Sequence, residues 1–596
     1  MRIICFKPKT PSFSFSSSGA TPSTNTDEDY TSTTSMDEAE ALILKWNPKT
    51  SAYAKVTSLF YEYRTEAMNY IRTVNQLQKT MHHLVAQNPS SQKLILAQNL
   101  MQIAMNRLQK EFHQILSMNR AHLDPESVST ISSRTSACSD SYEDGTPEED
   151  VRATGDSISE VERVSSEVMA DLKSIADCMV SNGYAIECVR VYTTMRKSIV
   201  DEGIYRLNVE ELSSSKVNKI DWEVLEFKIN SWLEAVKISV RTLFAGERIL
   251  CDHVFGTSRS IREACFANIS RSGATILFGF PEVVIKTKKS PPQKIFRLIE
   301  MYAAIVALWP EIESIFSLDS TTSIRSQTSA MLIRLTESVR MILSDFDITV
   351  QKDSSKSPAN FAGVHSLTTQ VMDHLCKLAD YSNVPSEIFL EVPQPPRSPL
   401  PESYTCSPES DDATTTESGF SVRMARLILA LICKIDAKSK HSKDVSLSYL
   451  CLANNLRYIV AKVRASKLQY VLGDDWILKH EEKVKRLMVN YEIVAWGKVL
   501  SSLPENPTLA IPPSEARVVF SNFNFEFEKA YRKQNVFIVP ELEFRVETKA
   551  CIARKITMIY REMYETHRID MGSVREMREY VTFTPDDVEN YLLNLF

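Results

Sequence analysis

The stretch 68–84 reads MNYIRTVNQLQKTMHHL, and it shows the pattern that decides the fold class. Its apolar side chains recur at every third or fourth position: Met68, Ile71, Val74, Leu77, Met81 and Leu84. This spacing places them along one stripe of an α-helix. The pattern returns after Asn88-Pro89-Ser90, at Leu100, Ile103, Ala104, Leu108, Phe112 and Ile115. The sequence therefore predicts a coiled-coil-like antiparallel pair of long helices within 37–118.

Similar apolar faces recur through most of the chain, over 158–181, 221–244, 292–315, 328–348, 419–435, 445–472 and 477–503. Period-two alternation is rare, and only the short run 283–285, Val-Val-Ile, has a β-like composition. The chain holds 14 glycines in 596 residues, about 2% against a typical value near 7%. Since glycine serves tight turns and phosphate loops, these features predict an all-α fold of stacked antiparallel helical bundles.

Polar segments separate the helical stretches and lack the aliphatic side chains that a core requires. We expect this organisation: a disordered Ser/Thr-rich head at 1–36, the helical hairpin at 37–118, an acidic Ser/Thr-rich linker at 119–158, helical bundles at 159–391, a Pro-rich loop or linker at 392–419, and C-terminal helical bundles at 420–596. The last region is expected to carry any membrane-facing end.

Charge and cysteine content limit the partners and the compartment. A net charge of −6 gives no reason to expect nucleic acid. The 11 cysteines are scattered without a CxxC pair, which is typical of reduced thiols in the cytoplasm. No stretch reaches the roughly 18 apolar residues of a membrane span. Any membrane contact is therefore expected to be peripheral.

The sequence has no recognisable motif for catalysis, a cofactor or a metal. It lacks the GxxxxGK[ST] and GxGxxG patterns of nucleotide sites, and none of its 10 histidines lies in a GxSxG or papain-like context. His82 and His83 are neighbours, so on a helix they point about 100° apart and make a poor metal pair. We therefore expect a protein that is not an enzyme and that needs neither cofactor nor metal.

Two polar features sit within apolar helical runs. Asn454 and Asn455 lie between Leu452 and Leu456, where they are expected to cap or cross-link neighbouring helices. The second feature is a basic stretch with Lys434, Lys438, Lys440 and Lys443. It has two interpretations: attraction to anionic lipid headgroups, or a solvated loop between helices. The residues alone favour the loop.

Longer strings are more specific than composition. They are DLKSIA at 171–176, GYAIEC at 183–188, DWEVLEFKINSW at 221–232, VRTLFAGERILCD at 240–252, YLCLANNLRY at 449–458, FSNFNFEFE at 520–528 and TPDDVENYL at 584–592. From about residue 160 to the end, this pattern resembles the seventy-kilodalton subunit of the exocyst complex in its expanded land-plant form. The short head and the helix start at Lys45-Trp46 resemble a plant subfamily with a trimmed N-terminal region.

This resemblance implies an elongated rod of stacked helical bundles within the exocyst, which tethers secretory vesicles to the plasma membrane. It implies other exocyst subunits, small GTPases and membranes with phosphatidylinositol 4,5-bisphosphate as partners. It also implies a cytoplasmic protein that is recruited peripherally to the plasma membrane or to vesicles. Some plant members are linked to immune signalling or autophagic transport instead.

In that family, a basic cluster just before the Phe-Asn motif, Phe523-Asn524 in this chain, supplies much of the lipid contact. This chain keeps Arg517 there but has Val519 and Ser521 at two other basic positions. The candidate lipid-binding residues are Arg517, Lys529, Arg532, Lys533, Lys549, Arg554 and Lys555, with the stretch from Lys434 to Lys443 as a secondary basic loop. The two losses leave open a second hypothesis, a divergent non-catalytic adaptor in plant immunity or autophagy-related trafficking with weakened lipid binding.

The fold prediction is tested by far-ultraviolet circular dichroism of the purified chain. We expect a predominantly helical spectrum, because the apolar periodicity is helical almost throughout. A sheet-rich spectrum would contradict both the fold class and the family resemblance.

Overall fold

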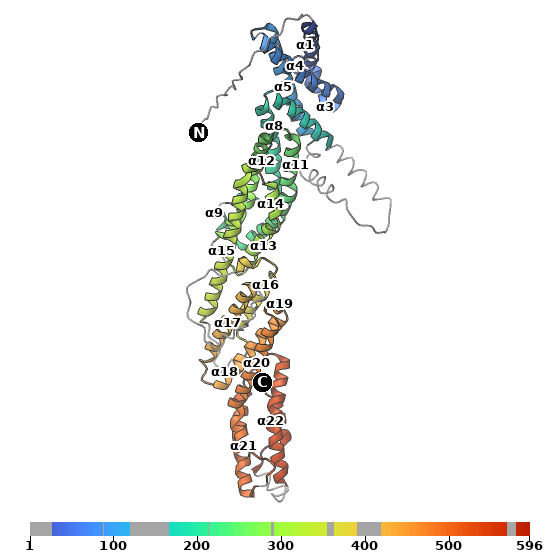
Figure 1. Cartoon of the computed structure of the whole chain (residues 1–596). Coiled ribbons are helices and arrows are strands. Elements are labelled where there is room, and N and C mark those ends of the chain that lie inside the picture. Colours follow the sequence, from blue (N-terminus) through green and yellow to red (C-terminus); the bar gives the residue numbers. More distant parts are fainter. Residues whose placement is uncertain are drawn as a thin grey trace, which may run out of the picture. The chain divides into compact units, whose positions relative to one another are not determined.

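A computed structural model describes residues 27–87, 89–119, 166–212, 214–287, 291–354, 363–389, 419–509, 511–568 and 580–596. All regular elements within these ranges are helices, and no β-strand occurs among them (Figure 1). The predicted all-α class of packed helical bundles is therefore confirmed. The segments 1–26, 120–165 and 390–418, which hold most of the predicted head, acidic linker and Pro-rich linker, lie outside the described residues.

The chain divides into two compact units. Unit 1 comprises Met1–Glu211, Asn230–Phe278 and Leu308–Gln327, whereas unit 2 comprises Leu212–Ile229, Gly279–Ala307 and Thr328–Phe596. Both units are therefore assembled from separate stretches of sequence.

Unit 1 is built on a long helical hairpin. Its elements are α1 (Asp27–Lys45), α2 (Ala52–Val56), α3 (Leu59–Glu62), α4 (Arg64–Gln87), α5 (Gln92–Met118), a helix at 166–181, α8 (Ala185–Arg206), the π-helix η1 (Ser239–Phe244), α11 (Ala245–Val254), α14 (Trp309–Ile315) and the 3₁₀-helix η2 (Asp319–Thr321). Helices α4 and α5 pack together, and α1 packs on both. Helix α1 begins inside the stretch 1–36 that was expected to be disordered.

Unit 2 holds α9 and α13 together with the helices from α16 to the end of the chain. They are α9 (Ser214–Val217), α13 (Lys294–Ala307), α16 (Ser366–Ala379), the 3₁₀-helix η3 (Ser386–Phe389), α17 (Gly419–Ser439), α18 (Val445–Arg464), α19 (Leu468–Leu472), α20 (Asp474–Ser501), α21 (Pro513–Gln534), α22 (Leu542–Arg568) and α24 (Pro585–Leu593). Three further helices have residues in each unit: α10 (Trp222–Ile238), α12 (Arg259–Ile285) and α15 (Thr322–Lys352).

Tertiary packing changes two details of the predicted helices. On α4 the buried stripe is centred on Tyr70, Val74 and Leu77, whereas Ile71, expected on that stripe, is only half-buried. The run 283–285, despite its β-like composition, forms the last turn of α12, and Val284 is fully buried. β-branched side chains have only a weak intrinsic preference against helix, which burial overrides.

A buried ion pair joins two helices inside unit 1. The side chain of Arg196 on α8 is 1% exposed and that of Glu247 on α11 is 0% exposed. Arg196 donates from Nε to Glu247 Oε2 at 3.1 Å and from Nη2 to Oε1. Such a forked pair fixes the relative register of the two helices, because either charge alone in the core would be strongly unfavourable.

Asn455 cross-links helices inside unit 2, as the sequence suggested. Its Oδ1 accepts hydrogen bonds from the His365 backbone N–H at 2.9 Å and from Thr368 Oγ1 at 2.7 Å. Its Nδ2 donates to the Gly363 carbonyl at 3.2 Å, and Asn454 Nδ2 donates to the Ile538 carbonyl at 3.1 Å. The two asparagines therefore bind α18 to the start of α16 and to the segment before α22.

We expect Arg196→Met to lower the free energy of unfolding by about 3–5 kcal/mol, because Glu247 would remain buried without its partner. Urea unfolding followed by circular dichroism measures this loss. The double variant Arg196→Met/Glu247→Leu should recover much of it, since neither charge remains in the core. A double variant as unstable as Arg196→Met would contradict the assigned pair.

His374 makes the stability of unit 2 depend on pH. Its ring lies 5.1 Å from the Phe296 ring and 4.5 Å from the Phe346 ring, centroid to centroid. Burial lowers the pKa of His374 to about 4, helped by the nearby charge of Lys377. An unfolded histidine titrates near pH 6.5. The stability from this neutral ring is therefore fully present above about pH 6.5 and is lost as pH falls through the folded pKa.

When the pH is lowered from 7 to 4.5, the free energy of unfolding should decrease by about 2 kcal/mol less in His374→Leu than in the wild type, since the variant has no imidazole to protonate. Urea unfolding at the two pH values measures the difference. Equal losses in both chains would show that carboxylates, and not His374, set the acid sensitivity.

Candidate functional site

The Phe-Asn motif forms the scaffold that positions the candidate lipid-binding residues. Phe523 on α21 stacks on Tyr560 of α22, with ring centroids 4.2 Å apart. Asn524 Nδ2 donates to the Tyr580 carbonyl at 2.9 Å and to Thr582 Oγ1 at 3.0 Å. The motif thus holds α21, α22 and the segment before α24 together.

Helix α24 begins with a reciprocal capping box. Thr584 Oγ1 accepts from the Asp587 backbone N–H at 3.1 Å, and Asp587 Oδ2 accepts from the Thr584 N–H at 2.9 Å. These bonds satisfy backbone donors that the first helical turn leaves free. The Thr584 hydroxyl also donates to Asp587 Oδ2 at 2.6 Å, and this hydrogen bond, together with the one from the Thr584 N–H, lowers the pKa of Asp587.

The candidate cations do not form one cluster. Arg517 lies in the second turn of α21, with its guanidinium 4.2 Å from the centroid of the Tyr580 ring. Lys529, Arg532 and Lys533 follow 12 to 16 residues later on the same helix, which corresponds to roughly 18–24 Å along the axis at 1.5 Å per residue. Lys549, Arg554 and Lys555 lie on α22.

Neighbouring carboxylates neutralise four of these seven cations. The ion pairs are Lys529 with Glu526 at 3.5 Å, Arg532 with Glu528, Lys533 with Asp444 at 3.0 Å, and Lys555 with Glu492. The hydrogen bond from Lys555 to Glu492 raises the pKa of Lys555. Within the part of the chain that the structure describes, no ion pair is recorded for Arg517, Lys549 or Arg554.

The secondary basic loop is shorter than predicted. Helix α17 continues through Ser439, so Lys434 and Lys438 are helical and not in a loop. Lys434 Nζ donates to the Gln351 carbonyl at 2.7 Å, and Lys438 pairs with Asp353 at 2.7 Å. Lys440 pairs with Asp436 at 2.8 Å. Carbonyl and carboxylate oxygens of the protein thus bind Lys434, Lys438 and Lys440. The interpretation of this stretch as a lipid contact therefore loses support.

Sequence reasoning missed two apolar side chains that stand among the cations of α21. Val518 is 58% exposed and Phe525 is 64% exposed, and Lys529 Nζ lies 5.4 Å from the centroid of the Phe525 ring. They are seven residues apart, so they share one face of the helix. The apolar periodicity alone would assign such residues to a core, and no sequence signal distinguishes them.

The described residues offer no alternative metal or membrane-spanning feature. No group of three or more His, Cys, Asp or Glu side chains with the spacing of a metal site occurs in the ranges given above. None of the helices in those ranges is both long and apolar enough to cross a bilayer.

Comparison with known proteins gives a consistent family assignment. The family model for the C-terminal region of the Exo70 subunit of the exocyst complex matches residues 230–594, and the model for the N-terminal region of the exocyst complex component Exo70 matches residues 35–118. The chain is 27% identical to the Arabidopsis thaliana exocyst complex component EXO70A1 over 94% of this chain and 87% of that protein. It is 26% identical to the Arabidopsis thaliana EXO70B1 over 86% of this chain and 81% of that protein.

Solved structures agree at the level of the fold. A Saccharomyces cerevisiae Exo70 structure superposes with a TM-score of 0.60 at 14% identity, covering 95% of this chain and 98% of the yeast chain. A second yeast Exo70p crystal structure gives the same TM-score at 16% identity, covering 94% and 100% of the two chains.

Proposed function

We propose, from the premise that this chain belongs to the Exo70 family of exocyst complex subunits, that it helps the exocyst to tether secretory vesicles at the plasma membrane. Family membership supports a role in the exocyst and other exocyst subunits as partners. The finer assignment is our proposal: a cytoplasmic protein, recruited peripherally to the plasma membrane or vesicles, with small GTPases and phosphoinositide membranes as further partners.

Surface composition supports docking to other proteins. Val56 and Tyr61 in unit 1 are 82% and 75% exposed, and Tyr205 is 70% exposed. In unit 2, Leu542 is 70% exposed. Large apolar side chains that face solvent favour contact with partner proteins when they gather into patches. A tethering protein requires such contact faces, and it does not require a catalytic pocket.

Ion pairing favours a second candidate, an adaptor with weakened lipid binding in plant immunity or autophagy-related trafficking. Among the seven candidate cations, only Arg517, Lys549 and Arg554 lack a recorded ion pair in the described residues. A basic residue near an anionic membrane contributes about 1 kcal/mol, and salt screens this attraction. Three such residues, spread over two helices, support weak and salt-sensitive binding.

Flotation with liposomes separates the two candidates. We expect the full chain to float with vesicles that contain phosphatidylinositol 4,5-bisphosphate at low salt and to float only weakly at physiological salt, because few cations are unpaired and salt screens their attraction. The double variant Val519→Lys/Ser521→Lys restores the two basic positions beside Arg517 and should float at physiological salt.

Two controls complete this experiment. Vesicles of phosphatidylcholine alone should bind neither chain, and Lys533→Ala, which removes a paired cation, should behave as the wild type. Robust flotation of the wild type at physiological salt would contradict weakened lipid binding and favour direct membrane tethering. Failure of the wild type to capture other exocyst subunits in a pull-down would contradict the role in the complex.

A further inference from the structure

Unit 2 contains an open cleft at the junction of α16, α18 and α19. Its volume is about 560 Å³, and its lining includes Lys377, Asp380, Arg464, Ser466, Lys467 and Tyr470. Helices α16 and α19 pack against each other, and Figure 1 shows their labels side by side. No candidate lipid-binding residue lines this cleft, so it is separate from the surface described above.

The cleft carries an excess of positive charge. Three of its lining side chains are cationic and one is anionic. Lys467 pairs with Asp380 at 3.2 Å, but the two side chains are 56% and 58% exposed, so this bridge is worth about 0–1 kcal/mol and is easily exchanged. Arg464 pairs with Glu481 outside the lining at 2.7 Å. No ion pair is recorded for Lys377 in the described part of the chain.

The rim of the cleft suits a peptide. The Tyr470 side chain is 87% exposed at the rim, and an exposed aromatic ring provides a stacking surface for an extended chain. Ser466 Oγ donates to the Val463 carbonyl at 3.3 Å and Gln469 Nε2 donates to Asp474 Oδ1 at 3.2 Å, so both side chains offer acceptor oxygens to backbone N–H groups. This combination of cations, hydrogen-bonding groups and one aromatic ring fits a carboxylate-rich peptide.

An acidic stretch of the same chain precedes α17, the helix that packs on α19 of this cleft. Residues 402–417 contain Glu402, Glu409, Asp411, Asp412 and Glu417 and no lysine or arginine. Helix α17 begins at Gly419, two residues after this stretch. Two residues later, Ser421 Oγ donates to the Val471 carbonyl at 2.8 Å, and Val471 directly follows Tyr470 of the rim.

Phe389, the last described residue before 390–418, lies close to the start of α17. The Phe389 ring, at the end of η3, lies 4.5 Å from the Phe420 ring, centroid to centroid. The described residues on either side of 390–418 therefore lie together, where α17 packs on η3 and on α19. An extended chain spans up to about 3.5 Å per residue, so the acidic residues next to Gly419 are well within reach of the cleft.

We propose that the cleft between α16, α18 and α19 is an acidic-peptide site whose occupant is residues 402–417 of the same chain. The lysines supply the attraction, and Asp380 opposes it and limits the affinity. Because the segment is covalently attached, its effective concentration at the cleft is high. An acidic peptide from a partner protein would have to displace it.

The test uses a fluorescein-labelled synthetic peptide of residues 402–417 and the anisotropy of its fluorescence. Two full-length chains are compared: the wild type, and a chain with Glu402→Gln, Glu409→Gln, Asp411→Asn, Asp412→Asn and Glu417→Gln. We expect the neutralised chain to bind the peptide at least about fivefold more tightly, since its own segment no longer competes. Equal affinity for the two chains would overturn the intramolecular assignment.

Three variants of the neutralised chain locate the site. Lys377→Glu/Lys467→Glu should weaken peptide binding by about tenfold or more, since two exposed attractions become repulsions. Asp380→Asn should tighten it, and Lys529→Glu, a reversal of an exposed lysine on α21, should leave it unchanged. Circular dichroism melts check that each variant folds. Insensitivity to the cleft substitutions would overturn the site.

A last arm separates the peptide from a lipid headgroup. The same variants are floated with vesicles that contain phosphatidylinositol 4,5-bisphosphate. We expect the Lys377→Glu/Lys467→Glu pair to leave flotation unchanged. Loss of flotation in this variant, without any peptide binding to the neutralised chain, would assign the cleft to a lipid and overturn the proposal.

Discussion

An amphipathic helix is stable only when another surface covers its apolar stripe, and this requirement organises both compact units. In unit 1, Tyr70, Val74 and Leu77 on α4 are buried where α5 and α1 pack on that helix. In unit 2, α18 is covered by α20, α17 and α16. Helix hairpins that cover one another in this way leave polar or mixed faces outward. Such faces are suited to contacts with several partners.

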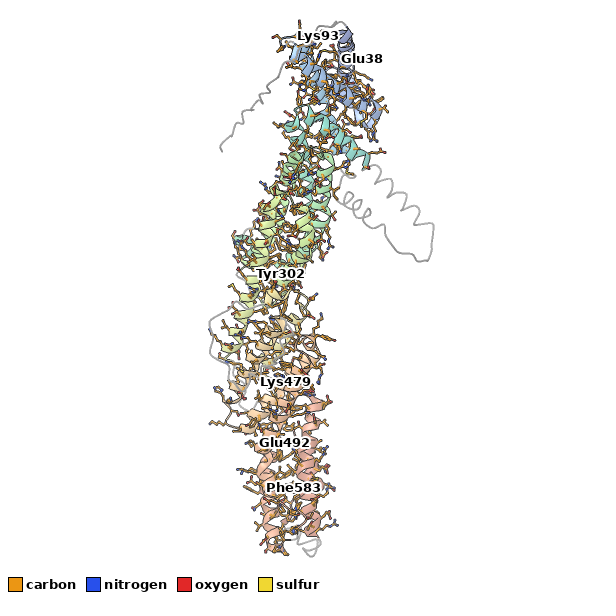
Figure 2. The ribbon with its side chains drawn as sticks, viewed as in Figure 1. Glu38, Lys93, Tyr302, Lys479, Glu492 and Phe583 are labelled. Atoms are coloured by element: carbon orange, nitrogen blue, oxygen red, sulfur yellow. The ribbon has the colours of Figure 1, made fainter. Side chains whose placement is uncertain are left out.

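Apolar stripes alone do not choose one arrangement, because many helix pairs can cover each other. Buried polar bonds supply the missing specificity. Asn455 accepts from the His365 backbone and from Thr368, and Arg196 forks onto Glu247 inside unit 1. A different register would leave these groups buried without partners, at a cost of several kcal/mol in the case of the ions. Figure 2 shows the side chains that the helices carry.

Pairing between side chains also decides which surface charges are available to ligands. The sequence gives no reason to prefer either of the candidate lipid-binding lysines Lys533 and Lys549. In the structure, Lys533 pairs with Asp444, whereas no ion pair is recorded for Lys549 among the described residues. A cation that already has a carboxylate neighbour gives a membrane less net attraction than a cation without one, although an exposed pair can exchange its partner. A family fold can thus be retained while the strength of one of its surface contacts changes.

The sequence by itself determined the helical class, because periodicity is a local property that about 20 residues suffice to reveal. The family strings are local in the same way. For Asn455 the sequence left capping and cross-linking open, and the structure decided for a cross-link. Tertiary structure alone decided that Tyr70 and not Ile71 faces the core, that 283–285 is helical, and that Lys438 is paired. It alone placed Lys377 and Lys467 around one cleft. These outcomes depend on residues that are distant in sequence, and no local pattern records which distant residue will be the neighbour.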